Sequence, residues 1–224
     1  SAQTLATIAG GAAVTDISQV RADADVYILS VKDDALPVLI PQLCRGREDK
    51  LFLHTAGSVS IDVFQGMARH YGVFYPMQTF SRQKRVSFEE IPCFIEGLGE
   101  EETAAIEALA SQLSHRVYRL SSEARKYLHL SAVFACNFVN HCYAISAELL
   151  EKHGIPFDVM LPLIDETAAK VHQMSPKDAQ TGPAVRYDEN VIRAQSQLLK
   201  NNPLVKDIYD RMSMNIHRLS EERN

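Results

Sequence analysis

The feature that most constrains this chain is residues 123–154, a long segment without proline that is rich in alanine and leucine. Gly154 and Pro156 close the segment, so it predicts one helix of about eight turns. Apolar residues recur along it at near-helical spacing, namely Leu130, Val133, Phe134, Phe138, Ile145, Leu149 and Leu150. Because such a pattern is typical of a core-facing helix, we expect this helix to be largely buried.

Four polar side chains are set into the same helix: His129, Asn137, Asn140 and His141. Since helical neighbours lie three or four residues apart, Asn137 and His141 are expected to share a face with His129. One interpretation is that each side chain satisfies a buried hydrogen bond, as buried polar groups usually do. The other is that the four side chains line a pocket facing a second domain. The pattern alone leaves both interpretations open.

Upstream of this helix, strand-like and helical segments alternate. Residues 26–31 form an apolar, β-branched run without alternation, which indicates a parallel strand covered on both faces. Further strands are predicted at 51–55, 73–75, 93–96 and 116–120, and helices at 2–9, 37–43, 60–70 and 100–114. This alternation predicts a mostly parallel α/β sheet with right-handed crossovers.

Downstream of residue 121 the pattern is helical throughout. Helices are predicted at 123–154, 156–174 and 187–200, followed by a last one that opens at Asn202 and Pro203. Pro162 is expected to kink or split the second of these helices. We therefore predict two domains, an α/β domain over 1–121 and an all-helical domain over 122–224.

Composition narrows the classes of partner. The net charge is −5 with mixed signs throughout and no basic tract, which argues against nucleic acid or an anionic membrane as the main partner. No apolar run approaches the roughly 18 residues that span a bilayer, and no signal peptide is expected. No CxxC pair occurs, so the cysteines are expected to be reduced, small core residues: Cys44, Cys93, Cys136 and Cys142. These features predict a cytoplasmic protein.

The ends of the predicted strands carry the best candidates for ligand contacts. Ligands of open α/β sheets bind beyond the carboxyl ends of the strands. Hydroxyls, amides and small residues stand at three such ends, in residues 30–33, 54–58 and 76–79. Each of these loops could alternatively be a well-capped turn, and the pattern does not decide between the two roles.

Several motifs of catalytic or binding sites are missing. Gly97 and Gly99 form a GxG, but three glutamates follow it, which suits a helix start and repels phosphate. The sequence contains no GxSxG, P-loop or HExxH motif. His129, His141 and His172 lack an accompanying carboxylate motif, so no metal site is predicted.

Residues 181–188, TGPAVRYD, are the least generic part of the predicted helical domain. Arg186 and Asp188 could form an ion pair that pins this turn. Alternatively, Arg186 presents its planar guanidinium to a carboxylate or phosphate of a ligand.

Six segments together carry a resemblance to a known family: VYILSVKDDALP, HTAGSVSIDVF, YPMQTFS, the helix with His129 and Asn137, LPLIDET and TGPAVRYD. Their order resembles the bacterial oxidoreductase family that joins a Rossmann-like domain to a helical DUF2520 domain. That family is similar to pyrroline-5-carboxylate reductases, 6-phosphogluconate and 3-hydroxyisobutyrate dehydrogenases, and coenzyme-F420-dependent NADP oxidoreductases. The resemblance implies a Rossmann-like NAD(P)-binding sheet followed by an all-α domain of the 6-phosphogluconate dehydrogenase C-terminal type.

The sequence departs from this family at its start. The family opens with a strand, a GxGN-type phosphate turn, a helix and a second strand, and these have no counterpart here. Phosphate binding at a helix N-terminus would depend on that opening.

The resemblance also implies roles for individual residues. The nicotinamide ribose of NADP or NAD would be bordered by Val31, Lys32, Thr55, Gly57 and Ser58. Gln78 and Thr79 would face a small-molecule substrate in an interdomain cleft, with Arg186 as a further substrate contact. His129 and Asn137 stand roughly where dehydrogenase relatives place a Lys and an Asn. His129 or His141 would then donate the proton that accompanies hydride transfer.

The function expected from these features is an NAD(P)-dependent reductase or dehydrogenase acting on a small carbonyl, imine or hydroxy acid. The alternative is a non-catalytic dimeric module that senses a nucleotide or binds a protein, motivated by the missing phosphate turn. A homodimer through the helical domain is expected because the last helix carries an apolar stripe of Leu204, Ile208, Met212 and Ile216.

Overall fold

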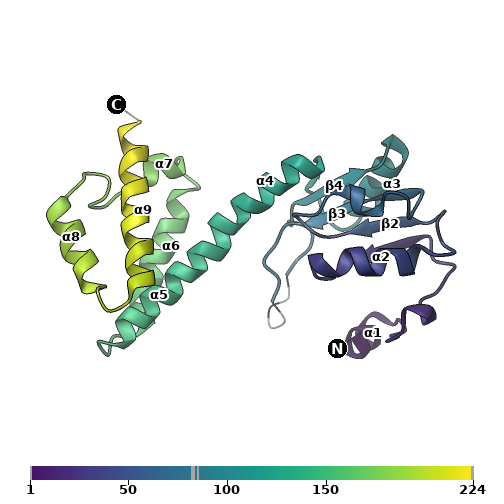
Figure 1. Cartoon of the computed structure of the whole chain (residues 1–224), viewed down its shortest axis with the longest axis horizontal. Helices are drawn as coiled ribbons and strands as arrows, with labels where there is room; N and C mark the ends of the chain where they lie inside the picture. The colour runs from purple at the N-terminus through teal and green to yellow at the C-terminus, as the bar shows by residue number, and fades with distance from the viewer. Residues whose placement is uncertain (1, 82–83, 85, 223–224) are drawn as a thin grey trace. The chain divides into compact units, whose positions relative to one another are not determined.

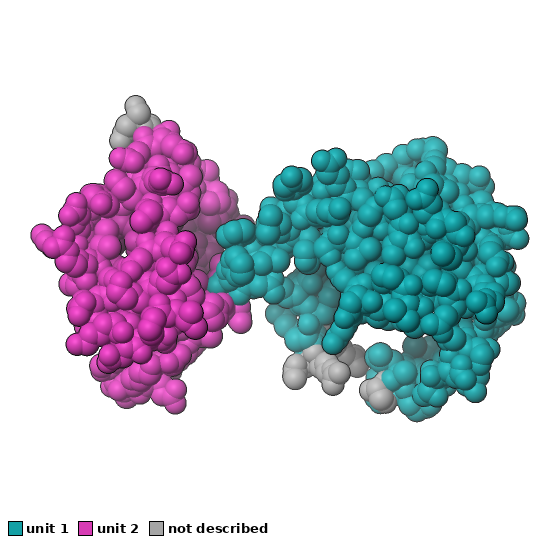
Figure 2. Space-filling model, viewed as in Figure 1, with its two compact units in different colours: residues 1–138 teal, residues 139–224 magenta. Residues whose placement is uncertain are grey.

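The structure is a computed structural model that describes residues 2–81, 84 and 86–222. It divides into two compact units, residues 1–138 and 139–224, coloured separately in Figure 2. The helix predicted to open the second domain begins at Ser122, with Ser121 as its cap, but its first half is grouped with the sheet. The domain boundary at 121/122 stays a prediction.

The first unit is built on one five-stranded sheet with strand order β1-β2-β3-β4-β5 (Figure 1). Its strands are β1 (Val26–Leu29), β2 (Leu51–His54), β3 (His70–Pro76), β4 (Cys93–Gly97) and β5 (Val117–Arg119). The first three strands are mutually parallel, β4 pairs antiparallel with β3, and β5 pairs parallel with β4. The carboxyl ends of the first three strands therefore meet at one edge, which confirms the predicted, mostly parallel α/β sheet.

Helices and single turns precede, connect and follow these strands. They are α1 (Ala2–Ala9), η1 (Ile17–Gln19), η2 (Asp33–Ala35), α2 (Leu36–Cys44), η3 (Ile61–Phe64), α3 (Glu100–Ser111) and α4 (Ser122–Ala132). Pro37 lies in the first turn of α2, where its missing N–H costs nothing.

The prediction of a helix over residues 60–70 is wrong. Only the short 3-10 turn η3 forms, with the Ser60 hydroxyl accepting a hydrogen bond from the Asp62 N–H as the predicted cap. Gly66 then adopts a φ of 75°, which breaks a right-handed helix, and His70 pairs with Leu51 as the first residue of β3. Strand pairing with β2 overrides the local helical pattern.

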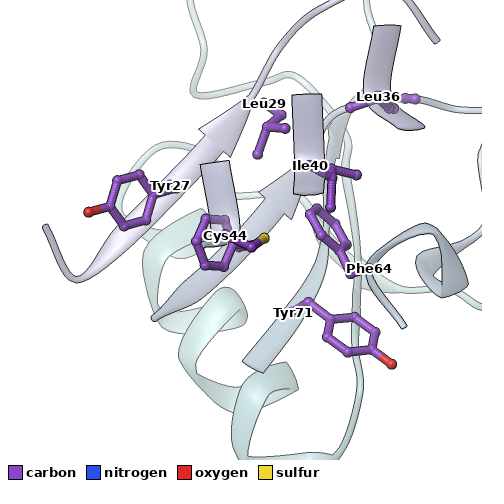
Figure 3. Close-up of a cluster of buried hydrophobic side chains, with 9 residues drawn as sticks. Tyr27, Leu29, Leu36, Ile40, Cys44, Phe64 and Tyr71 are labelled. Atoms are coloured by element: carbon purple, nitrogen blue, oxygen red, sulfur yellow. The ribbon is translucent and has the colours of Figure 1, made fainter. Parts of the chain in front are cut away.

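Two buried clusters pack against the sheet, because successive side chains of a strand point to opposite faces. Phe52 belongs to the first cluster, which includes Tyr27, Leu29, Leu36, Ile40, Cys44, Phe64 and Tyr71 (Figure 3). The adjacent Leu53 belongs to the second, with Phe74, Ile91, Cys93, Ile95, Ile106 and Ala110.

The expectation that the first strand is covered on both faces is wrong. Tyr27 and Leu29 are buried, whereas Val26 is 37% and Ile28 48% exposed. The helix on the second face, α3, packs over β3, β4 and β5 and leaves β1 uncovered there.

The second unit is all helical, as predicted. It contains α5 (Val139–Glu151), η5 (Phe157–Met160), α6 (Leu161–Lys170), α7 (Pro176–Ala179), α8 (Glu189–Leu198) and α9 (Pro203–Glu221). Pro162 lies in the first turn of α6, directly after the 3-10 turn η5, so the predicted split of this helix occurs there. Among the described residues, no helix is both long and apolar enough to cross a membrane.

The predicted long helix forms as three consecutive segments, α4, the π-helix η4 (Val133–Phe138) and α5. The expectation that this helix is largely buried is wrong for the single chain, since Leu130, Phe134 and Phe138 are each at least 50% exposed. The helical apolar pattern therefore marks a surface rather than the core of this chain. Cys136, on η4, is exposed and contradicts the expected core role, whereas Cys44 and Cys93 are buried.

Candidate functional site

The turn after β2 lies against the helix α4. Gly57 in this turn is buried, and a Cβ added to it would lie 2.6 Å from His129 Nδ1 and 2.9 Å from Tyr75 Cζ. Only a residue without a side chain allows the imidazole and the phenol ring to approach this closely. Three chain segments, from β2, β3 and α4, thus converge at the carboxyl edge of the parallel strands.

Tyr75 and His129 form a hydrogen-bonded pair at this edge. The Tyr75 hydroxyl lies 3.2 Å from His129 Nδ1, and the two rings meet edge to face with centroids 6.2 Å apart. Burial raises the pKa of the Tyr75 phenol above its usual value, because ionisation there would leave a poorly solvated phenolate. Tyr75 therefore keeps its proton at neutral pH and acts as a neutral hydroxyl.

Arg125 anchors the start of α4 one turn before His129. Its side chain is fully buried and donates to Glu96 Oε2 at 2.5 Å and to the Val59 carbonyl oxygen at 2.6 Å. Ser122 completes the network, since its hydroxyl donates to Glu96 Oε2 at 2.6 Å and accepts from the Ile61 N–H at 2.9 Å. These bonds fix α4 to β4 and to the loop after β2, and so set the position of His129.

Hydroxyl groups join the ends of β1 and β2. Ser58 donates a hydrogen bond to the Asp33 carboxylate, and the Thr55 hydroxyl donates to Ser30 Oγ at 3.3 Å. Val31 and Lys32, which follow β1, are both exposed, and Lys32 precedes the turn η2. The five residues predicted to border a cofactor therefore stand at the ends of these two adjacent strands, and their role stays a prediction.

The residues predicted to contact the substrate are Gln78, Thr79 and Arg186. Gln78 and Thr79 are exposed beyond the end of β3, and the Gln78 side-chain oxygen accepts from the Thr79 N–H at 2.8 Å. Arg186 is exposed in the second unit. Asp188 does not pair with Arg186 among the described residues; it caps α8 by accepting from the Val191 N–H at 3.3 Å.

The face predicted for His129, Asn137 and His141 assumed unbroken α-helical spacing. Asn137 instead lies in the π-helix η4, whose turns close from residue i to i+5, and that spacing argument fails between His129 and Asn137. Both Asn137 and His141 are exposed, and His141 belongs to the second unit. The structure brings His129 together with Gly57 and Tyr75, and the roles of the other two stay predictions.

His54, at the end of β2, is a structural histidine. It is fully buried, it stacks on Phe64 and its Nδ1 accepts from the Ala56 N–H at 3.1 Å. Burial, helped by the nearby Arg125 charge, lowers the pKa of His54 to about 4. It therefore stays neutral near pH 7.

Within the described part of the chain, no three His, Cys, Asp or Glu side chains are grouped so as to hold a metal ion.

Comparison with known proteins gives one family and several solved structures. The family described as "Domain of unknown function (DUF2520)" matches residues 91–216, more than half of the chain. The structure of a "putative NADP oxidoreductase" from Bacteroides fragilis is 53% identical, with a TM-score of 0.92, covering 97% of this chain and 85% of that one. A comparison with curated proteins found no match.

More distant structures share the fold. A protein from Thermotoga maritima is 23% identical with a TM-score of 0.75, covering 99% of this chain and 87% of that one. An imine reductase from Myxococcus stipitatus in complex with NADP+ is 14% identical with a TM-score of 0.66, covering 99% and 83%. These likenesses confirm the predicted Rossmann-like fold class with an all-helical second part. By the profile match and by 53% identity over nearly its whole length, the chain belongs to the DUF2520 family.

Proposed function

We propose that this protein is an NAD(P)-dependent oxidoreductase that transfers a hydride to or from a small carbonyl, imine or hydroxy acid. The observation that carries the proposal is the Tyr75–His129 pair, held against the Gly57 turn at the carboxyl edge of three parallel strands. That edge is where open α/β sheets bind ligands. The likeness to the 53% identical protein described as a "putative NADP oxidoreductase" supports the same class of chemistry.

The turn after β2 fits the nicotinamide end of such a cofactor. The peptide of Gly57 is proposed to border the cofactor, and Ser58 offers an exposed hydroxyl whose oxygen can still accept a hydrogen bond while it donates to Asp33. Thr55, Val31 and Lys32 would complete the border of the ribose. When bound, the nicotinamide supplies or takes the hydride, while the protein orients the reactants and exchanges the proton.

His129 is the residue we assign to that proton. Imidazole exchanges protons near neutral pH, and the ring is half-buried beside the proposed ribose site. Asn137 and His141 are proposed to assist, Asn137 by a hydrogen bond to the substrate and His141 as a second proton donor. Gln78, Thr79 and Arg186 are proposed as contacts to a small polar substrate.

A homodimer is proposed as the working form. The exposed apolar side chains include Phe134 and Phe138 on η4, which meet edge to face, and Leu204 and Met212 on α9. An exposed apolar area of this kind is typical of an interface between subunits. Light scattering at micromolar concentration is expected to give twice the chain mass, and a monomeric mass would contradict the proposal.

A nicotinamide assay tests the proposed reaction. The oxidation of NADPH and of NADH is followed by absorbance in the presence of small imines and carbonyls. With hydroxy acids, the formation of NADPH and of NADH is followed instead. Turnover with one of these substrates is expected to fall by roughly 10²–10⁴-fold in His129→Gln, the range a general acid contributes. His153→Gln, which changes an exposed histidine of the second unit, is the matched control and should leave turnover unchanged. Equal turnover in both variants would contradict the role of His129.

A further inference from the structure

The two nitrogens of His129 stand in different surroundings. Nδ1 lies 3.2 Å from the Tyr75 hydroxyl and 2.6 Å from the point where a Cβ of residue 57 would lie. The Nδ1 edge of the ring is therefore closed by the Gly57 backbone and the Tyr75 ring. The side chain is half-buried, and among the described residues no hydrogen bond is made by Nε2, which lies on the opposite edge of the ring.

Tyr75 has the hydrogen-bonding capacity to hold Nδ1 in either protonation state. Burial raises the pKa of its phenol, so the hydroxyl keeps its hydrogen at neutral pH. A hydroxyl carries one donor and two acceptor lone pairs, and a neutral imidazole carries a single N–H. When His129 is neutral, Nδ1–H donates to the Tyr75 oxygen and Nε2 is bare. When His129 is protonated, Nδ1–H donates to the Tyr75 oxygen and Nε2–H remains free.

We propose that Tyr75 is a positioning residue that holds His129 through Nδ1, so that Nε2 is the atom that exchanges a proton with the substrate. The inference rests on the proposed function. In the reductive direction, the Nε2–H bond of protonated His129 breaks and its proton passes to the substrate nitrogen or oxygen as hydride reaches the carbon. The ring becomes neutral with its remaining hydrogen on Nδ1, accepted by Tyr75, and regains a proton from water.

The Gly57 turn has a part in the same arrangement. Because it closes the Nδ1 side, water is excluded there and Tyr75 is the group left to satisfy that nitrogen. A buried nitrogen without a partner would be costly, so loss of the Tyr75 hydroxyl is expected to release the ring from its single orientation.

Nitrogen NMR of the histidine ring tests the proposal without any need for turnover. In protein labelled with 15N histidine, with the signals assigned by their loss in His129→Gln, neutral His129 of the wild type is expected mainly as the Nδ1–H tautomer. Tyr75→Phe is expected to give a mixture of both tautomers. Tyr127→Phe is the matched control, because Tyr127 lies on the same helix and is 66% exposed. Unchanged His129 signals in Tyr75→Phe would overturn the proposal.

Kinetics separate this inference from the proposed function. Tyr75→Phe is expected to lower kcat by about 10-fold, part of the roughly 10²–10⁴-fold that a general acid provides, and to shift the pH profile with little change in the KM for the nicotinamide. If Tyr75→Phe changes the His129 tautomer but the wild type shows no turnover, the positioning role is retained and the oxidoreductase function is contradicted. If the wild type turns over substrate but Tyr75→Phe keeps the wild-type NMR signals and pH profile, the positioning role is contradicted and the oxidoreductase function is retained.

Discussion

The guanidinium of Arg125 donates to Glu96 Oε2 at 2.5 Å, with the arginine side chain fully buried and the glutamate side chain 17% exposed. The pair joins α4, which carries His129, to β4 of the sheet. Removing one partner of such an ion pair is strongly destabilising, because the other charge is left without a counter-charge. The position of the candidate site therefore depends on two side chains that do not touch the proposed ligands.

Replacing Arg125 by Ala is expected to lower the free energy of unfolding by about 3–5 kcal/mol, because it leaves the Glu96 carboxylate, only 17% exposed, without a counter-charge. Urea denaturation measures the loss. Arg119→Ala is the control: Arg119 also pairs with a glutamate, Glu107, at 2.6 Å, but on the surface, where ion pairs contribute little. Equal losses in the two variants would contradict the anchoring role of Arg125.

The buried His54 predicts a loss of stability in mild acid. Its folded pKa of about 4 lies below the ordinary histidine value of 6.5, so the unfolded chain binds the extra proton first. The contribution of neutral His54 is complete above pH 6.5 and is lost as the pH falls towards 4, by about 3 kcal/mol over that window. Denaturation midpoints of wild type and His54→Gln between pH 7.5 and 4 check this. The variant is expected to show a flatter pH dependence, and parallel curves would refute the prediction.

Gly57→Ala is expected to displace the His129 ring and to lower turnover by at least 10-fold, with a smaller effect on folding. The added Cβ would meet the ring at 2.6 Å, but a side chain can move where a strand could not. Gly11→Ala is the control, because nothing lies within 4 Å of its added Cβ and its φ is not in the left-handed region. Turnover and thermal unfolding are measured on both. An active Gly57→Ala enzyme would show that the close approach to His129 is not needed.

The sequence predicts the order of strands and helices because hydrophobic runs and capping residues are local signals. It fails at residues 60–70, where the pairing of His70 with Leu51 is a contact between distant segments. It also misjudges the long helix, since the spacing of Phe134 and Phe138 shows that an apolar face exists but not which surface covers it.

The candidate site was predictable only in part. Gly57 and His129 stand out as a small residue at a strand end and a polar residue in an apolar helix. Tyr75 resembles an ordinary strand residue, and Arg125 an exposed helical charge, because arginine is rarely buried. The available signal for Arg125 was its place four residues before His129, on the same helical face.

The most direct measurement for the oxidoreductase proposal is a fluorescence titration of NADPH and NADH. It uses the protein produced from its whole reading frame, with the 224-residue chain titrated beside it. Micromolar binding of at least one nucleotide by the whole protein is expected, weakened in Gly57→Ala and unchanged in Gly11→Ala. Failure of the whole protein to bind either nucleotide would contradict the proposed oxidoreductase function.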